Sequence, residues 1–471
     1  MKSILVIGGD MNGLIAAIYL ARAGHSVTVL EADRQFGGAA ANRVPVGALA
    51  VPSGPGVLEA LDPRVLKDLK LSLSYASRDL PLIGLRAGAA PLVLPREVHD
   101  ARRALTPISE RDAERFSEFR REHYAVARAM RSVWWEEGEL RDDVHAHLRR
   151  LSVTAATAWL DGAFETDALR ASYAFDALGG GLSPAAAGSA LLFTWRAAQE
   201  ISGLQGAVAI PVGGTQTLID QLLMIAEANG VRLRSEAKVV RLNSDGESVR
   251  GAILEDDEIV PAGLVVSSLP RRKTLVGFLP PGAAGLAMTR HLARPQATGE
   301  ARVLLGMNAL PSMFEQPARY IVAERLETAS LAFAEARSGQ IPSDLAFEVV
   351  ALPTGSSPPY VLSIAVRPVP VEPVGGWKEN ATKLVQAALR TLEQHVPHFL
   401  SFIGGLAFVP PRQRDPFDLG AMTSPWRTRI ETPLHGLYLC GETAEPVPCF
   451  SGRAARIAAA IVIRDLKEAS L

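Results

Sequence analysis

The stretch SILVIGGDMNGLIAAIYLARAGHSVTVLE, residues 3–31, decides the fold. Ser3–Ile7 is short, rich in β-branched residues and followed by glycine, which predicts a buried strand. Apolar residues then recur at helical spacing from Asn12 onward, and Gly24 ends this helix as the residue after its C-cap. A second apolar run, His25–Leu30, predicts another strand. The stretch is therefore expected to form a βαβ unit with two parallel strands.

The turn between the first strand and the helix has a glycine pattern that suits a diphosphate. Gly8 allows the tight turn, Gly13 lets helix and strand pack closely, and the helix N-terminus offers unpaired N–H groups to an anion. Glu31 ends the second strand, where its carboxylate can accept from both ribose hydroxyls and would repel a 2′-phosphate. The unit therefore predicts binding of FAD or NAD and not of NADP. The residues expected to contact the cofactor here are Gly8, Gly9, Asp10, Asn12, Gly13, Glu31 and Ala32.

Asp10 stands where such turns have their middle glycine. A Cβ atom at this place crowds the approach of the backbone to a pyrophosphate, and a carboxylate adds repulsion between like charges. At an effective dielectric constant near 20, two unit charges about 4 Å apart repel by roughly 4 kcal/mol. That energy corresponds to about three orders of magnitude in affinity as an upper bound. Asp10 therefore either turns toward solvent or an arginine, or it weakens the binding of the cofactor.

The segments that follow resemble the FAD oxidoreductases of the phytoene desaturase and monoamine oxidase superfamily. EADRQFGGAA, residues 31–40, is similar to the extension after the βαβ unit of that superfamily. The resemblance implies that Gly37 and Gly38 lie against the FAD pyrophosphate, and it places Ala39 where these proteins often have an arginine. IPVGGTQTLIDQLL, residues 210–223, resembles their turn that opens a helix, and residues 231–270 resemble their strand, three-stranded ribbon and return strand. In such a ribbon the backbone of Val239 packs near the adenine, whereas the residues alone read equally as plain strand core.

The segment TPLHGLYLCGETAEPVPCFSGRAARIAAAIVI, residues 432–463, resembles the strand, turn and helix that close the FAD site of this superfamily. The resemblance implies that Gly441 forms the turn, that Glu442 contacts the ribityl chain and that Gly452 allows a close approach at the start of the helix. Cys449 and Phe450 stand where relatives have a glycine-rich run beside the flavin. Cys449 is either a buried structural thiol or a point of covalent attachment. A segment that relatives carry before this last strand has no counterpart.

The resemblance implies an α/β fold in which a Rossmann-like FAD-binding domain holds an inserted α+β substrate domain. The FAD-binding domain is expected over residues 1–78, 204–282 and 405–471. The substrate-binding domain is expected over residues 79–203 and 283–404. Residues 80–199 read as helices, and residues 300–370 contain runs that are typical of strands.

Composition excludes several classes of protein. The chain has 471 residues and a formal net charge of −1, which lacks the basic excess of nucleic-acid-binding proteins. Its two cysteines, Cys440 and Cys449, form no disulfide framework and no metal motif. Because few cysteines suit a reducing compartment and the sequence starts directly with a strand, a cytoplasmic location is expected. The mean hydropathy of +0.13 leaves a peripheral membrane contact open.

The sequence predicts an FAD-dependent oxidoreductase that removes a hydride from an apolar or amine-type small molecule. FAD is expected to bind without a covalent link, and neither a metal site nor a catalytic side chain is assigned, because the flavin itself performs such chemistry. The alternative is a non-redox member of the same fold whose FAD site has eroded. Such a protein would bind a lipid or prenyl group, or serve as the non-catalytic subunit of a flavoprotein complex. Homo-oligomers and a partner flavoprotein subunit are both compatible with the sequence.

Overall fold

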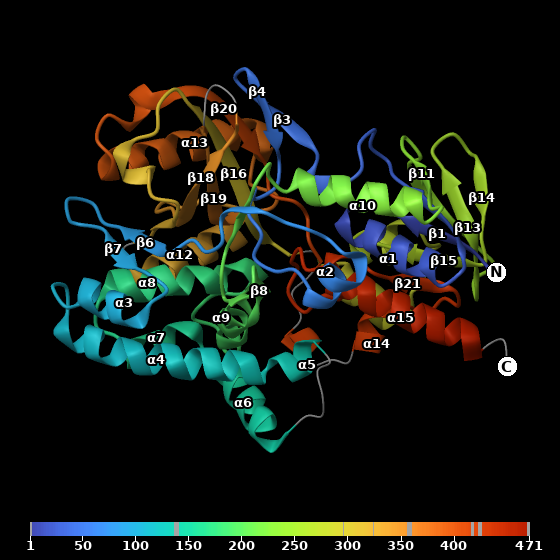
Figure 1. Ribbon diagram of the computed structural model, residues 1–471, viewed down its shortest axis with the longest axis horizontal. Coiled ribbons are helices and arrows are strands. Elements are labelled where there is room, and N and C mark those ends of the chain that lie inside the picture. Colours follow the sequence, from blue (N-terminus) through green and yellow to red (C-terminus); the bar gives the residue numbers. More distant parts are fainter. Residues whose placement is uncertain are drawn as a thin grey trace.

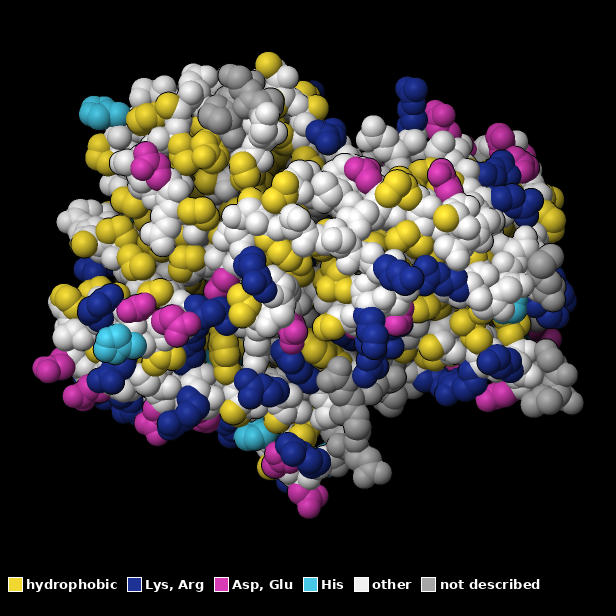
Figure 2. All heavy atoms as spheres, viewed as in Figure 1, with side chains coloured by type: hydrophobic (Ala, Val, Ile, Leu, Met, Phe, Trp, Pro, Cys, Tyr) yellow, Lys and Arg dark blue, Asp and Glu magenta, His cyan; other side chains and the backbone are white. Residues whose placement is uncertain are grey.

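The structure is a computed structural model that describes residues 2–135, 141–294, 296–323, 325–355, 360–415, 419–422 and 426–468. Figure 1 shows two regions side by side, one around the N-terminal βαβ unit and the other around a larger sheet with a layer of helices beneath it. Figure 2 shows basic and acidic side chains interspersed over one face of the molecule. None of the helices within the described ranges is long and apolar enough to cross a lipid bilayer.

A five-stranded parallel sheet is built around the N-terminal βαβ unit. Its order is β11-β2-β1-β15-β21, and every neighbouring pair is parallel. Its strands are β1 (Ser3–Ile7), β2 (Ser26–Leu30), β11 (Arg232–Arg234), β15 (Leu264–Ser267) and β21 (Leu437–Leu439). Since the carboxyl ends of parallel strands meet at one edge, the turn after β1, Glu31 after β2 and the turn after β21 collect there.

The two faces of this sheet are covered differently. Ile4 and Val6 of β1 belong to the core under three helices, and Leu5 and Ile7 belong to the core under a three-stranded antiparallel ribbon. This alternation follows from the period of two along a strand. The helices are α1 (Met11–Arg22), α10 (Gln216–Ala228) and α15 (Arg453–Glu468), and the ribbon strands are β12 (Val239–Ser244), β13 (Val249–Leu254) and β14 (Ile259–Pro261). The α/β fold class expected from the sequence is thus confirmed, whereas the exact domain bounds stay a prediction.

A mostly antiparallel seven-stranded sheet of order β20-β16-β19-β18-β17-β6-β7 forms the second region. Only β17 and β6 pair in parallel within it. Its strands are β6 (Leu82–Leu85), β7 (Leu92–Leu94), β16 (Thr298–Met307), β17 (Arg319–Val322), β18 (Phe347–Pro353), β19 (Tyr360–Pro370) and β20 (Ile403–Val409). The strand prediction for residues 300–370 is therefore confirmed, with one helix, α12 (Leu326–Arg337), between β17 and β18.

Residues 80–199 are mainly helical, as the sequence predicts, but two strands at their start were missed. The helices are α3 (Val98–Leu105), α4 (Glu110–Ala129), α5 (Arg131–Trp135), α6 (Asp142–Val153), α7 (Ala156–Ala163), α8 (Asp167–Ala174) and α9 (Ser189–Ala198). Helix α13 (Gly376–His395) contributes Leu384, Ala388 and Leu392 to the core of the seven-stranded sheet. The missed strands β6 and β7 are short, and β6 pairs with β17, which lies more than 200 residues later. A contact of that sequence separation leaves no local pattern.

The remaining helices and strands are short. They are β3 (Arg43–Val46), β4 (Leu49–Pro52), α2 (Pro63–Leu69), β5 (Tyr75–Ser77), β8 (Glu200–Ile201), β9 (Leu204–Gln205), β10 (Ile210–Pro211), α11 (Leu286–Leu292) and α14 (Trp426–Ile430).

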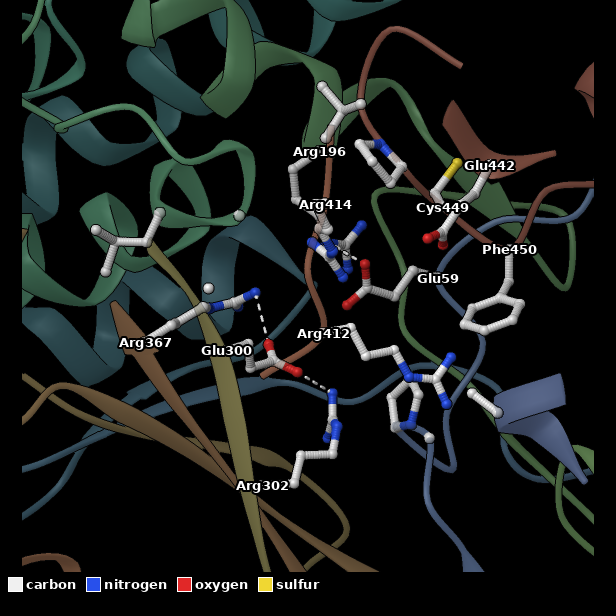
Figure 3. Close-up of a pocket in the computed structure, with 18 of the residues that line it drawn as sticks. Glu59, Arg196, Glu300, Arg302, Arg367, Arg412, Arg414, Glu442, Cys449 and Phe450 are labelled. Atoms are coloured by element: carbon white, nitrogen blue, oxygen red, sulfur yellow. Dashed lines mark hydrogen bonds and ion pairs between the residues drawn. The ribbon is translucent and has the colours of Figure 1, made fainter. Parts of the chain in front are cut away.

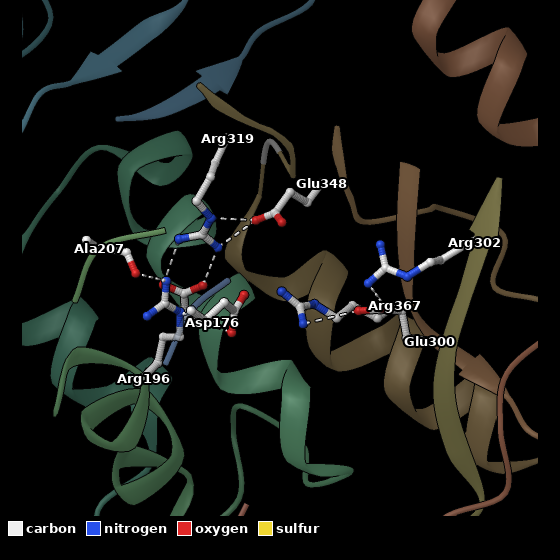
Figure 4. A network of polar contacts seen from close by, with 9 residues as sticks. Asp176, Arg196, Ala207, Glu300, Arg302, Arg319, Glu348 and Arg367 are labelled. Carbon is white, nitrogen blue, oxygen red and sulfur yellow. Dashed lines mark hydrogen bonds and ion pairs between the residues drawn. The ribbon is translucent and has the colours of Figure 1, made fainter. Parts of the chain in front are cut away.

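A buried ion network ties α8 and its following turn to the seven-stranded sheet (Figure 4). Arg319 of β17 lies 2.6 Å from a carboxylate oxygen of Asp176 and 2.6 Å from one of Glu348. Burial raises the pKa of Asp176, but the charges of Arg319, Arg196 and Arg367 outweigh it and leave this pKa below its usual range. The stabilisation that Asp176 provides is therefore present at neutral pH and is lost as the pH falls below about 4.

Replacing Arg319 with methionine is expected to lower the free energy of unfolding at pH 7 by about 3–5 kcal/mol. The substitution removes the guanidinium that contacts both Asp176 and Glu348, and the loss should shrink toward pH 5, because without Arg319 the desolvation of Asp176 favours its protonated form. Urea denaturation at both pH values measures it. Arg103→Met is the control, because it removes an exposed pair with Asp100 and should cost less than about 1 kcal/mol. An equal loss at both pH values would contradict the electrostatic explanation.

Candidate active site

Asp10 caps its own helix. It is the N-cap of α1, and its Oδ1 accepts a hydrogen bond from the Gly13 N–H at 2.9 Å. Burial raises the pKa of Asp10 to about 6, against the lowering effect of the Gly13 N–H, and the nearby charges of Glu442 and Glu31 raise it further. The half-buried carboxylate thus caps its own helix and forms no ion pair with an arginine among the described residues. It lies at the positive end of the helix, where an anionic ligand would bind.

The same helix end still has free groups for a ligand. The N–H groups of Met11 and Asn12 have no hydrogen-bond partner among the described residues. Asn12 is 5% exposed, and its side-chain Oδ1 is buried with no hydrogen-bond partner among the residues that the structure describes. Free amide donors suit a pyrophosphate, and a buried acceptor suits a hydroxyl, both of which FAD carries. The residues at this turn therefore fit the cofactor, with Asp10 as a competing anion.

Glycine is required at this turn by close backbone contacts. A Cβ atom on Gly13 would lie 1.9 Å from the Gly8 carbonyl oxygen, so α1 could not pack this close to the turn with any side chain there. Gly8 itself has a φ of +94°, which favours glycine. The roles that the sequence analysis gives to these two glycines, a tight turn and close packing, match the geometry.

Glu31 lies at the end of β2 and holds two backbone amides. Its Oε2 accepts from the Gly9 N–H at 2.6 Å, and its Oε1 accepts from the Asp33 N–H at 2.9 Å. A carboxylate has about four acceptor sites, so lone pairs remain for ribose hydroxyls. The adjacent Ala32 is exposed. Val239 begins β12 and is 6% exposed. Two residues before it, the Ala237 N–H donates a hydrogen bond to the Glu31 carbonyl oxygen at 2.8 Å, so the start of β12 lies close to Glu31.

The second glycine pair lies directly against the first turn. The Gly37 N–H donates to the Gly9 carbonyl oxygen at 2.7 Å, and a Cβ atom on Gly38 would lie 3.2 Å from that of Asp10. Both glycines have a positive φ, +111° and +55°. Ala39 is buried and offers no charge to a pyrophosphate. The tertiary structure therefore brings the pair next to Asp10, and its contact with a pyrophosphate stays a prediction.

The C-terminal segment closes the same site. Gly441 packs against Ser268, because a Cβ atom on Gly441 would lie 1.9 Å from the Ser268 carbonyl oxygen. The Oγ of Ser268 in turn donates a hydrogen bond to the Gly8 carbonyl oxygen at 3.2 Å. Glu442 begins the short helical turn that follows. Gly452 has a φ of +70°, and a Cβ atom there would lie 2.7 Å from Ile15 of α1. Residues more than 400 positions apart thus form one wall around the start of α1.

A cavity of about 200 Å³ extends from this wall toward α9 and the seven-stranded sheet (Figure 3). Cys449 and Phe450 line it together with Glu442, and their place at a flavin edge stays a prediction. Burial, and then the charge of Glu445, raise the pKa of the Cys449 thiol well above its usual value. The thiolate needed for nucleophilic chemistry is therefore disfavoured, which supports a structural thiol.

The charged part of this cavity was not predicted from the sequence. Its lining includes Arg196, Arg302, Arg367, Arg412 and Arg414, and its acidic members are Glu59, Asp176, Glu300 and Glu442. A signal was present, because Glu300, Arg302 and Arg367 interrupt apolar strand runs of β16 and β19. Charged residues are rarely buried in strands unless they are paired or functional. Within the described ranges no group of three or more histidine, cysteine or acidic residues could hold a metal ion.

Known proteins match this chain over most of its length or over part of it. A rat protein named pyridine nucleotide-disulfide oxidoreductase domain-containing protein 2 is 24% identical over 98% of this chain and 93% of its own length. A phytoene dehydrogenase of Streptomyces griseus is 28% identical over 59% of this chain and 56% of its own length.

Solved structures share the fold at low identity. An oxidoreductase from Methanosarcina mazei has a TM-score of 0.67 at 18% identity and covers 98% of this chain and all of its own. A triple mutant of putrescine oxidase has a TM-score of 0.66 at 15% identity and covers 99% of both chains. A family model, flavin containing amine oxidoreductase, matches residues 11–311, which is more than half of the chain. This protein therefore belongs to the family of flavin-containing amine oxidoreductases, a membership that implies redox chemistry and a flavin cofactor.

Proposed function

We propose that this protein is an FAD-dependent oxidoreductase that removes a hydride from a C–H bond of a small molecule. The proposal rests on the fact that the expected FAD-binding turn and the cavity are connected. The start of α1 has free amides beside Glu31, and the cavity begins at Glu442, Cys449 and Phe450 and extends from there into the second region. A dinucleotide held at the first feature and a substrate held in the second would meet at this boundary.

The placement of Glu31 favours FAD over FMN, which has no adenosine, and over NADP, whose 2′-phosphate it would repel, and the flavin family of the chain favours FAD over NAD. The Glu31 carboxylate stands at the end of β2, beside the diphosphate-binding turn, where it suits an adenosine ribose with two free hydroxyls. A bound FAD would supply a two-electron acceptor beside the cavity. The protein itself orients the substrate and excludes water, for which the apolar part of the lining is suited. That part includes Leu178, Leu192, Trp195, Val447 and Phe450.

Binding without a covalent bond is part of the proposal. The resemblance leaves Cys449 as the candidate for attachment, and the raised pKa of its half-buried thiol works against that reaction. The cytoplasmic location, a peripheral membrane contact and a partner subunit stay predictions.

A second candidate function rests on Asp10. Its carboxylate already lies at the helix end where the pyrophosphate would bind, and Glu31 and Glu442 add negative charge around it. If this charge prevents FAD from binding, the protein would keep the family fold without its redox chemistry and act as a binding module or non-catalytic subunit.

The purified protein is expected to be yellow, or to become yellow after incubation with FAD and removal of the excess. Its visible flavin bands should bleach when dithionite is added and return in air. The absorbance spectrum before and after incubation measures this. A colourless protein that takes up no FAD between pH 5 and pH 8 would overturn the proposal and leave the binding module as the function.

A further inference from the structure

The cavity beside the expected flavin position has a basic side. Arg302 of β16, Arg367 of β19, Arg196 of α9, and Arg412 and Arg414 after β20 come from separate elements, and we call these five the cationic wall. Figure 3 shows their side chains gathered around Glu59 and Glu300. Five guanidinium groups around a cavity of about 200 Å³ is a high density of positive charge. Burying this much positive charge costs free energy unless nearby anions neutralise it.

The acidic residues on this side offset only part of that charge. Glu300 contacts both Arg302 and Arg367, the latter at 3.3 Å, so one carboxylate is shared by two cations. Burial raises the pKa of Glu300, but the charges of Arg302, Arg367 and Arg414 outweigh it and leave this pKa below its usual range. Asp176 is bound by Arg319, which does not line the cavity. The charges of Arg196 and Arg367 also act on Asp176, yet the five arginines of the cationic wall outnumber the four acidic side chains that line the cavity, so positive charge remains for a ligand.

Donors remain unused on the cationic wall. Arg412 and Arg414 make no ion pair with an acidic side chain in the part of the chain that the structure describes. Nε and Nη1 of Arg196 are buried without a hydrogen-bond partner there, and its nearest ion-pair contact, to Glu59, is 3.7 Å long. Gln199, which is 2% exposed and also lines the cavity, has an unpartnered Oε1. The cavity therefore offers several guanidinium donors and one amide acceptor to a ligand.

These groups discriminate between classes of substrate. A protonated amine would meet like charge, and a hydrocarbon would leave the guanidinium groups without water or a partner. A carboxylate accepts the paired N–H bonds that a guanidinium presents in one plane. We propose that the substrate oxidised at this site is a small carboxylate whose acid group is bound by the cationic wall, an inference that rests on the proposed redox function.

The oxidation balances without further groups on the protein. A bound FAD would accept a hydride from one carbon of the carboxylate substrate, and the neighbouring nitrogen, oxygen or carbon would lose a proton to solvent, so that a double bond would form between the two atoms. The two electrons would leave to an acceptor such as dioxygen, which would become hydrogen peroxide. The carboxylate itself is unchanged, because the cationic wall only binds and orients it.

Equilibrium dialysis with benzoate, in the presence and absence of FAD, tests the proposal. Benzoate is expected to bind, whereas benzamide and benzylamine, which match its shape without the negative charge, should bind at least tenfold more weakly. Arg414→Gln and Arg412→Gln should each weaken benzoate binding about tenfold or more, because each removes one charged donor. The matched control Arg102→Gln, at an exposed position of α3 that does not line the cavity, should leave the dissociation constant unchanged.

The outcomes separate this inference from the proposed function. Tight FAD binding together with equal affinity for benzoate, benzamide and benzylamine would overturn the carboxylate assignment and leave the FAD enzyme intact. Benzoate binding that both cavity variants weaken, in a protein that takes up no FAD, would support the anion site and overturn the redox function. Competition between FAD and benzoate would assign the cationic wall to the cofactor, and tighter binding of phenyl phosphate than of benzoate would assign it to a phosphate ester. Either result would overturn the proposal.

Discussion

Replacing Asp10 with asparagine is expected to tighten FAD binding by about tenfold to a hundredfold at pH 8 and to leave it nearly unchanged at pH 5. The carboxylate of Asp10 lies at the helix end that would receive the pyrophosphate, and its pKa is raised to about 6 by burial and by the charges of Glu442 and Glu31. At pH 8 it is ionised and repels the cofactor, whereas at pH 5 it is mostly neutral. Affinity of the wild type should therefore rise as the pH falls through about 6.

Asparagine is the appropriate substitution because it removes the charge and keeps the cap. Its side-chain oxygen can still accept from the Gly13 N–H, and asparagine is as good an N-cap as aspartate. Titration of the apoprotein with FAD, followed by the quenching of flavin fluorescence, gives the dissociation constant at each pH. The control is Asp142→Asn, which removes an exposed carboxylate from the first turn of α6. Equal affinities of wild type and variant at pH 8 would show that Asp10 does not face the pyrophosphate.

The same substitution has a consequence for stability. A carboxylate whose pKa is higher in the folded than in the unfolded state destabilises the fold progressively as the pH rises from about 4 to about 6. Each tenfold change in proton affinity is worth about 1.4 kcal/mol, so the ionised Asp10 costs at most about 3 kcal/mol above pH 6. Asp10→Asn should recover part of this free energy of unfolding at pH 8 and none of it at pH 4.

Replacing Gly13 with alanine is expected to lower the free energy of unfolding by about 3 kcal/mol or more. The new Cβ atom would lie 1.9 Å from the Gly8 carbonyl oxygen, and since both partners are backbone, no change of rotamer relieves the contact. Helix α1 would have to move away from the turn after β1, which also removes the free amides from the cofactor site. Urea denaturation followed by far-ultraviolet circular dichroism measures the loss.

Gly162→Ala is the matched control, because Gly162 lies within α7 and a Cβ atom there meets nothing within 4 Å. Alanine is the better helix former by about 1 kcal/mol, so this variant should be as stable as the wild type or slightly more stable. Should Gly13→Ala prove as stable as the control, the close packing of α1 on the turn would not be what requires glycine.

The N-terminal βαβ unit was predictable because its signals are local. Apolar runs, helical spacing and the glycines at positions 8, 13 and 24 all lie within residues 3–31, and the strands Ser3–Ile7 and Ser26–Leu30 match the prediction closely. The strands β6 and β7 were missed because they are stabilised by a distant strand. The direction of Asp10 was equally outside the reach of the sequence, since solvent, an arginine and its own helix were all available to a carboxylate at that position.

The sequence by itself determined that this chain carries the motifs of an FAD fold and which glycines and carboxylates are expected at its cofactor edge. Those residues lie at turns whose conformation depends on neighbours only a few positions away in the sequence. Only the tertiary structure decided what lies opposite that edge. Arg196, Arg302, Arg367, Arg412 and Arg414 come from a helix, two neighbouring strands and a loop spread over more than 200 residues. Their convergence depends on the register of β16 against β19 and on the packing of α9, which no local pattern encodes.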